Sequence, residues 1–289
     1  DIQDVAENSL KQQLERYAAD HGVAILMEVK TGAIRAIVNL QRQSDGNYNE
    51  NCLNFAIGEA MEPGSTFKLA TVMACLEDGV ISVDDTINTF AGEFRFFDRT
   101  MRDSKKGGHG MIKVDEAFEV SSNIAFSRIV DKCYRKDPQR FINRLRSLGI
   151  CDSLGIELPG EARTFLKNYN EDGWSRTSLP WMSIGYEMTI SPLHILTLYN
   201  AVANGGTMMR PMFVEGISEN GEIVERKRPK VLRNSIASRK TIETVRRMLE
   251  GVVEKGTAIN IKNTKGYSIA GKTGTAQIAN KGQYSNQGE

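Results

Sequence analysis

Apolar and polar residues follow two different periods in the first part of the chain. Through the first twenty residues, apolar side chains recur every three to four positions and Gly22 follows as a stop signal, which predicts an amphipathic helix. Residues 23–29 and 33–38 then form two runs rich in β-branched residues, joined through Lys30-Thr31-Gly32. This second pattern predicts a β-hairpin.

Helical periodicity dominates the middle of the chain. One helix is predicted to begin at Ser65, because Pro63-Gly64 stands just before an apolar face that continues to about Gly79. Further predicted elements are helices over residues 112–120, 124–134, 138–148, 193–204 and 242–256, a hairpin over 213–225 about Asn220-Gly221, and a last strand over 267–278.

The order of these elements predicts the fold class. A helix, a hairpin, a long helical middle and a late helix followed by a strand indicate an α+β protein, with helices flanking a mostly antiparallel sheet. Neither an internal repeat nor a low-complexity linker divides the sequence. We therefore expect residues 1–289 to form one domain that carries a helical subdomain over roughly residues 80–205.

Composition and charge exclude several classes of protein. The 289 residues are 40% hydrophobic and 25% charged, and 37 basic against 36 acidic residues leave a net charge of +1. No global field therefore favours nucleic acid as a partner. The four cysteines show no C-x-x-C spacing and no neighbouring histidine pairs, so we expect no metal, cofactor or redox motif, and their disulfide state stays open. These cysteines are Cys52, Cys75, Cys133 and Cys151.

One serine and one lysine are spaced for nucleophilic catalysis. A serine hydroxyl needs a base within hydrogen-bond reach, and Ser65 and Lys68 share one face of the predicted helix. Because a chain of this composition contains about one such S-x-x-K pair by chance, the spacing alone carries little weight. The Pro63-Gly64 helix start adds to it, since the positive end of the helix dipole favours a developing alkoxide and a neutral lysine. We predict Ser65 as the nucleophile and Lys68 as its base.

Two further motifs follow in order along the chain. Ser121-Ser122-Asn123 falls between two predicted helices, and Lys272-Thr273-Gly274-Thr275 falls within the last predicted strand. This order of S-x-x-K, S-x-N and K-T-G resembles the penicillin-recognising serine enzymes. Residues 63–68 and the Gly-Lys-Thr-Gly-Thr-Ala-Gln string at 271–277 resemble class B penicillin-binding proteins, the monofunctional transpeptidases of cell division and elongation. The similarity runs along the whole chain.

The resemblance implies roles for the catalytic residues. Ser65 would attack the carbonyl of a D-alanyl-D-alanine stem peptide, and Lys68 would accept its proton. Ser121 would relay a proton toward the leaving amine. Asn123 would hold Lys68 and the substrate amide.

The resemblance also implies how the substrate is bound. Lys272 would supply positive charge, and the hydroxyls of Thr273 and Thr275 would bind the substrate carboxylate. Gly274 has no side chain and would let substrate lie along the strand. The N–H groups of Ser65 and Thr275 would form an oxyanion hole.

Two other triplets fit these motifs but are predicted to be structural. Ser218-Glu219-Asn220 leads into a turn signal, and Lys30-Thr31-Gly32 joins two predicted strands. Either triplet would therefore stand in a solvated loop.

The residues leave several activities open. A β-lactamase or a β-lactam-sensing domain would share the nucleophile and differ in how fast the acyl-enzyme is hydrolysed. A D,D-carboxypeptidase would use water instead of an amine as acceptor, and a catalytically silent binding module would keep the pocket without turnover. No glutamate is clearly placed like the deacylating one of class A β-lactamases, and the 271–277 string favours transpeptidases. The resemblance thus favours a peptidoglycan D,D-transpeptidase that cross-links cell wall and is acylated by β-lactams.

The resemblance further implies parts beyond this sequence. The family's sheet continues with two strands and a terminal helix after the K-T-G strand, whereas residues 280–287 are polar and turn-like, so we expect a truncated C-terminus. No run of about eighteen apolar residues is present. We expect a bitopic parent protein in the cytoplasmic membrane, with this domain in the periplasm or extracellular space. The implied partners are stem peptides, β-lactam antibiotics, a glycosyltransferase and divisome or elongasome proteins.

Overall fold

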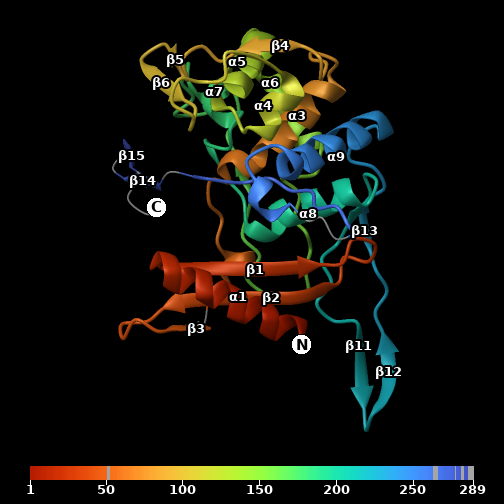
Figure 1. The fold of residues 1–289 in the computed structure, drawn as a ribbon. Coiled ribbons are helices and arrows are strands. Elements are labelled where there is room, and N and C mark those ends of the chain that lie inside the picture. The colour runs from red at the N-terminus through yellow and green to blue at the C-terminus, as the bar shows by residue number, and fades with distance from the viewer. Residues whose placement is uncertain (51–52, 263–265, 277, 281–282, 286–289) are drawn as a thin grey trace.

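The N-terminal hairpin forms the main sheet of the fold. In the computed structural model, which describes residues 1–50, 53–262, 266–276, 278–280 and 283–285, this sheet has the antiparallel order β1-β2-β3. Its strands are β1 (His21–Met27), β2 (Ile34–Arg42) and β3 (Tyr48–Glu50). Helix α1 (Ile2–Tyr17) packs on one face of the sheet, because Leu14 contributes to a small core with Val38 and Leu40 (Figure 1).

Helix α3 (Lys68–Glu77) forms the centre of the larger, helical part of the molecule. Its residues 68–75 are all buried, because α5 (Asn123–Tyr134), α6 (Pro138–Ser147) and α9 (Arg239–Glu254) pack around it. Helix α8 (Pro192–Ala203) contacts both β1 and α9 and so lies between the sheet and the helical part (Figure 1).

Shorter elements connect these layers. The remaining helices are α2 (Phe55–Gly58), η1 (Gly64–Phe67), α4 (Val114–Glu119), α7 (Ser178–Met182) and η2 (Ile259–Ile261). The short strands pair antiparallel as β4 (Thr86–Asn88) with β7 (Met111–Lys113), β5 (Glu93–Phe96) with β6 (Arg99–Arg102), β8 (Phe165–Leu166) with β9 (Met188–Thr189), β10 (Met208–Met209) with β13 (Val231–Arg233), β11 (Gly216–Glu219) with β12 (Glu222–Arg226), and β14 (Ile278–Asn280) with β15 (Gln283–Ser285). The β11–β12 hairpin projects away from the rest of the molecule (Figure 1).

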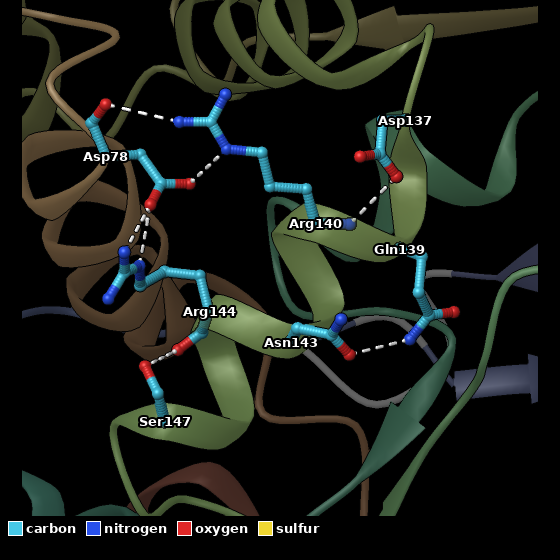
Figure 2. Close-up of a pocket in the computed structure, with 7 residues that line it drawn as sticks. All are labelled: Asp78, Asp137, Gln139, Arg140, Asn143, Arg144 and Ser147. Carbon is cyan, nitrogen blue, oxygen red and sulfur yellow. Dashed lines mark hydrogen bonds and ion pairs between the residues drawn. The ribbon is translucent and has the colours of Figure 1, made fainter.

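A buried carboxylate fixes the C-terminal end of α3 to α6. Figure 2 shows Arg140 and Arg144, one helical turn apart, both reaching Asp78. Arg144 lies 2.6 Å and Arg140 3.2 Å from the carboxylate of Asp78, whose side chain is only 3% exposed. The hydroxyl of Tyr134 donates to the same carboxylate at 2.9 Å. The pocket drawn in Figure 2 is lined by these two arginines and by two aspartates, Asp78 and Asp137, so its charges balance and do not favour a charged ligand.

The predicted fold class is confirmed. The helices predicted over 124–134, 138–148, 193–204 and 242–256 and both predicted hairpins are present, with Asn220-Gly221 in the turn between β11 and β12. The helix predicted over 112–120 is wrong at its start, because Ile112 pairs with Ile87 in the β4–β7 ladder and the α4 helix begins only at Val114.

The strand predicted over 267–278 is wrong over residues 267–276, and of its described residues only Ile278 lies in a strand, at the start of β14. Residues 267–276 have no strand structure, because no described strand provides a hydrogen-bonding ladder for them. The backbone N–H of Gly271 instead donates to the carbonyl of Leu249 in α9 at 3.1 Å. Within the described residues, β1 likewise has no strand on its outer edge. Gln277 and Cys52 lie outside the described residues.

The described residues contain no helix with the length and apolar character needed to cross a membrane. Three of the four cysteines lie in the described part of the chain, and all three are free thiols. These are Cys75, Cys133 and Cys151.

Candidate active site

Ser65 and Lys68 stand at the junction of η1 and α3. The chain turns sharply through Pro63 and Gly64, so Ser65 lies in a single 3₁₀ turn and Lys68 begins the α-helix. Lys68 Nζ lies 3.0 Å from Ser65 Oγ, within hydrogen-bond distance. The structure thus gives the predicted nucleophile and base direct contact.

Lys68 is fully buried, which disfavours its charged form. Its side chain is 0% exposed, and Nζ also donates to the Ser121 carbonyl at 2.7 Å and to Asn123 Oδ1 at 2.7 Å. The pKa of Lys68 is lowered well below its ordinary value, first by burial and then by the positive charge of Lys272, while Asp103 partly opposes the shift. The lowered pKa makes the free amine, the form that can act as a base, available at lower pH than in an exposed lysine.

Ser121 connects the two lysines. Its Oγ lies 3.1 Å from Lys68 Nζ and 2.8 Å from Lys272 Nζ. The residue has φ of 58°, in the left-handed region that a serine adopts only at a cost of about 1 kcal/mol or more. This backbone conformation, between α4 and α5, turns both the carbonyl and the hydroxyl of Ser121 toward Lys68.

An aspartate that the sequence did not single out holds the S-x-N motif in place. Asp103 follows β6 and accepts hydrogen bonds from Ser122 Oγ at 2.9 Å, from the Asn123 N–H at 2.6 Å and from the Ile124 N–H at 3.0 Å. The preceding Arg102 carbonyl accepts from Asn123 Nδ2 at 2.8 Å. Asn123 is therefore fixed on both sides, and its Oδ1 is directed at Lys68.

The K-T-G segment packs closely against the turn that carries Ser65. Burial lowers the pKa of Lys272 to about 8. A Cβ atom on Gly274 would lie 2.7 Å from the Thr66 methyl group, and one on Gly64 would lie 2.5 Å from the Thr275 carbonyl. This close approach needs glycine at both positions. It also brings the exposed Thr275 next to the turn that carries Ser65.

A groove of about 560 Å³ adjoins this site. Tyr199 of α8 lines it and donates its hydroxyl to the Thr66 carbonyl at 2.8 Å, which steadies the turn after Ser65. Glu62 lines it as well and accepts from the Glu187 N–H at 3.0 Å. Neither residue belongs to a recognisable motif. The apolar spacing over residues 193–204 predicted the helix that carries Tyr199, but it did not distinguish this tyrosine from the core residues of the same helix.

The two other triplets that fit the motifs, residues 30–32 and 218–220, lie outside this site. The prediction of solvated loops is wrong in part. Thr31 and Gly32 do lie between β1 and β2, but Gly32 is buried, and Ser218 and Glu219 are exposed residues of strand β11 with only Asn220 in the turn. No group of three or more metal-ligating side chains occurs in the part of the chain that the structure describes.

A serine in contact with a buried lysine, bridged through a second serine to the lysine of a K-T-G segment, defines the class of penicillin-recognising serine enzymes. Residues 22–289 match the family model described as penicillin binding protein transpeptidase domain. The chain therefore belongs to the penicillin-binding protein transpeptidase domain family.

Curated relatives and solved structures agree with this assignment. The chain is 28% identical to penicillin-binding protein PbpB of Mycolicibacterium smegmatis over 97% of its own length and 44% of that protein's. It is 26% identical to stage V sporulation protein D of Bacillus subtilis, over 98% of this chain and 44% of that one. The chain thus spans somewhat less than half the length of these relatives. Penicillin binding protein 3 of Mycobacterium tuberculosis, complexed with aztreonam, superposes with a TM-score of 0.82 at 27% identity, covering 99% of this chain and 65% of that one.

Proposed function

We propose that this chain is the acylating domain of a peptidoglycan D,D-transpeptidase, with Ser65 as its nucleophile. The observation that carries the proposal is the contact of 3.0 Å between Ser65 Oγ and the buried Lys68 Nζ. A lysine whose pKa is lowered by burial can take the serine proton as the Oγ attacks a carbonyl carbon. The relatives named peptidoglycan D,D-transpeptidase, such as FtsI of Buchnera aphidicola, support the same reaction.

The proposed reaction has two acyl-transfer steps. Ser65 Oγ bonds to the carbonyl carbon of the penultimate D-alanine, and the terminal D-alanine leaves with a proton that passes from Lys68 through Ser121. An amine of a second stem peptide then attacks the ester, gives its proton back through Ser121 and Lys68, and releases Ser65. The Ser121 hydroxyl supports this relay, because it lies within hydrogen-bond distance of both Lys68 and Lys272.

Substrate binding is assigned to the K-T-G segment and the turn at Ser65. Lys272 and the hydroxyls of Thr273 and Thr275 would hold the terminal carboxylate. The N–H groups of Ser65 and Thr275 would stabilise the oxyanion. The proximity of the Thr275 backbone to Gly64 supports this pair of donors.

The whole protein's setting is part of the proposal. We infer that the parent protein cross-links cell wall outside the cytoplasm, that it is anchored in the cytoplasmic membrane, and that β-lactams acylate Ser65. The solved relative complexed with aztreonam supports the last point. A glycosyltransferase and the division or elongation machinery are proposed as its partners.

Covalent labelling tests the proposal. Incubation with a penicillin is expected to add the mass of the intact drug to the Ser65 peptide, and the Ser65→Ala variant should stay unlabelled. Absence of an adduct on the unaltered chain would show that the site does not acylate and would favour a silent binding module. Rapid loss of the adduct with ring-opened product would favour a β-lactamase. A D-alanyl thioester donor supplied with and without an acceptor D-amino acid would separate transpeptidase from carboxypeptidase activity.

A further inference from the structure

A threonine outside the three motifs contacts the K-T-G segment. Thr257 follows α9, and its Oγ1 lies 2.6 Å from Thr273 Oγ1. Both side chains are exposed, so neither needs the other to satisfy a buried polar group. The contact therefore links Thr257 to the segment that contains Lys272 without being needed to satisfy a buried group.

The backbone of Thr257 is held by the helix that leads to Ser121. The Thr257 N–H donates to the carbonyl of Glu119, the last residue of α4, at 3.1 Å. A Cβ on Gly256 would lie 2.3 Å from that same carbonyl, so the chain approaches Glu119 as closely as glycine allows. The buried Glu119 carboxylate also pairs with Lys255 at 3.0 Å.

This arrangement joins two of the catalytic motifs through α4. Glu119 stands two residues before Ser121, and Thr257 reaches from Glu119 to the residue after Lys272. In the described residues the K-T-G segment has no strand ladder to fix it. The Thr257 hydroxyl contacts this segment, and so does the Leu249 carbonyl of α9, which accepts from the Gly271 N–H at 3.1 Å.

We propose that Thr257 is a specificity-determining residue that orients the Thr273 hydroxyl toward the terminal carboxylate of the substrate. A hydroxyl has one proton to donate and two lone pairs that accept. When Thr257 donates to Thr273 Oγ1, the Thr273 proton is left to donate to the carboxylate. The hydrogen bond from Thr257 also polarises the Thr273 hydroxyl and so strengthens its hydrogen bond to the carboxylate. This inference rests on the proposed function, because it assumes that the K-T-G segment meets a carboxylate.

Two substrates that differ at one group test the inference. A D-alanyl thioester of mercaptoacetate presents a carboxylate where a terminal D-alanine has one, and the matching mercaptoacetamide thioester presents an uncharged amide. Thr257→Val removes the hydroxyl at nearly constant volume, and Thr257→Ser keeps it. Thr207→Val is the control, since it removes a hydroxyl that bonds the Asn234 carbonyl at 3.2 Å in the connection after α8.

We expect Thr257→Val to lower kcat/KM for the carboxylate thioester about tenfold, mainly through KM, as expected for one charge-assisted hydrogen bond. Hydrolysis of the amide thioester should change less than about twofold. Thr257→Ser should restore the carboxylate preference, and Thr207→Val should leave both rates unchanged. Equal losses with both thioesters, no loss, or no rescue by serine would overturn the inference.

A binding measurement separates this inference from the proposed reaction. In the Ser65→Ala background, which cannot acylate, the affinities of a D-alanyl-D-alanine peptide and of its C-terminal amide are measured by calorimetry. Adding Thr257→Val should weaken only the carboxylate peptide. If the unaltered chain fails to acylate but this difference is seen, the proposed reaction fails and the role of Thr257 stands. If Thr257→Val weakens neither peptide, or both alike, the role of Thr257 is excluded.

Discussion

Lys272 Nζ lies 2.8 Å from Ser121 Oγ, so two side chains 151 residues apart in sequence meet at the centre of the site. The contact brings a second positive charge near Lys68, and that charge helps to lower the pKa of Lys68. Burial in turn lowers the pKa of Lys272 to about 8. In the proposed reaction the two lysines would therefore have different roles: Lys68 would accept the proton as a neutral amine, and Lys272 would supply positive charge only while it is protonated.

This division predicts a bell-shaped pH dependence of acylation. The rate constant for acylation by a penicillin should rise with pH as Lys68 loses its proton, and should fall above about pH 8 as Lys272 becomes neutral. Lys272→Arg keeps the positive charge at every pH measured, so it should remove the alkaline fall. Rate constants between pH 5 and 10 provide the measurement. An alkaline fall that stays at the same pH in Lys272→Arg would contradict this assignment.

The burial of Lys68 also predicts how stability depends on pH. Because its pKa is lowered in the folded state, the unfolded chain binds a proton that the folded chain lacks, and the contribution of Lys68 to the free energy of unfolding should rise with pH up to the unfolded pKa near 10. One such proton contributes up to about 1.4 kcal/mol per pH unit. Lys68→Met removes this group, so its free energy of unfolding should rise less steeply between pH 7 and 10. Denaturant titrations at several pH values measure the slopes, and equal slopes would exclude the lowered pKa.

The loop at Gly185 is predicted to hold the turn that carries Ser65. Gly185 has φ of 91°, and a Cβ there would lie 2.1 Å from the Gly64 carbonyl. Gly160 is a matched control, because its φ is 92° and a Cβ would meet nothing within 4 Å. Gly160→Ala should lower the free energy of unfolding by about 1 kcal/mol through backbone strain alone. Gly185→Ala should cost about 1–3 kcal/mol more and slow acylation at least about tenfold. Similar losses of stability and activity in the two variants would show that the contact with Gly64 is unimportant.

Sequence patterns predicted the local parts of the site and missed those made by tertiary contact. The pairing of Ser65 with Lys68 could be predicted, because both lie within one helical turn. The contact between Ser121 and Lys272 was accessible only through resemblance to a family, since no local rule brings together residues so far apart. Asp103 and Thr257 are single polar residues in loops and belong to no sequence motif, so the sequence did not predict that they contact the site.

The errors in secondary structure have the same origin. Residues 267–276 have strand-like composition, but a strand forms only where a partner supplies the ladder, and Gly271 bonds to α9 instead. Ile112 has helical spacing with the residues after it, yet pairing with Ile87 takes it into a strand. In both segments the secondary structure is set by the element that packs or pairs with the segment and not by its local propensity.

Asp103 is predicted to position the S-x-N motif and to tune Lys68. Asp103→Ala removes the acceptor for Ser122, Asn123 and Ile124, so it should slow acylation at least about tenfold and lower the free energy of unfolding by about 1–2 kcal/mol. Asp137→Ala is the control, because Asp137 caps α6 through the Arg140 N–H at 3.3 Å, away from the three motifs. It should show a similar loss of stability with unchanged acylation.

Asp103→Asn separates charge from capping. Asparagine keeps one carbonyl oxygen that can accept from the backbone of α5, but it removes the negative charge that raises the pKa of Lys68. Without that charge, Lys68 loses its proton at lower pH, so the acid limb of the acylation profile should move to lower pH. A purely structural role for Asp103 would lower the rate at every pH and leave the limb in place. The direction of the shift therefore decides whether Asp103 acts on the charge of the base or only on the shape of the turn.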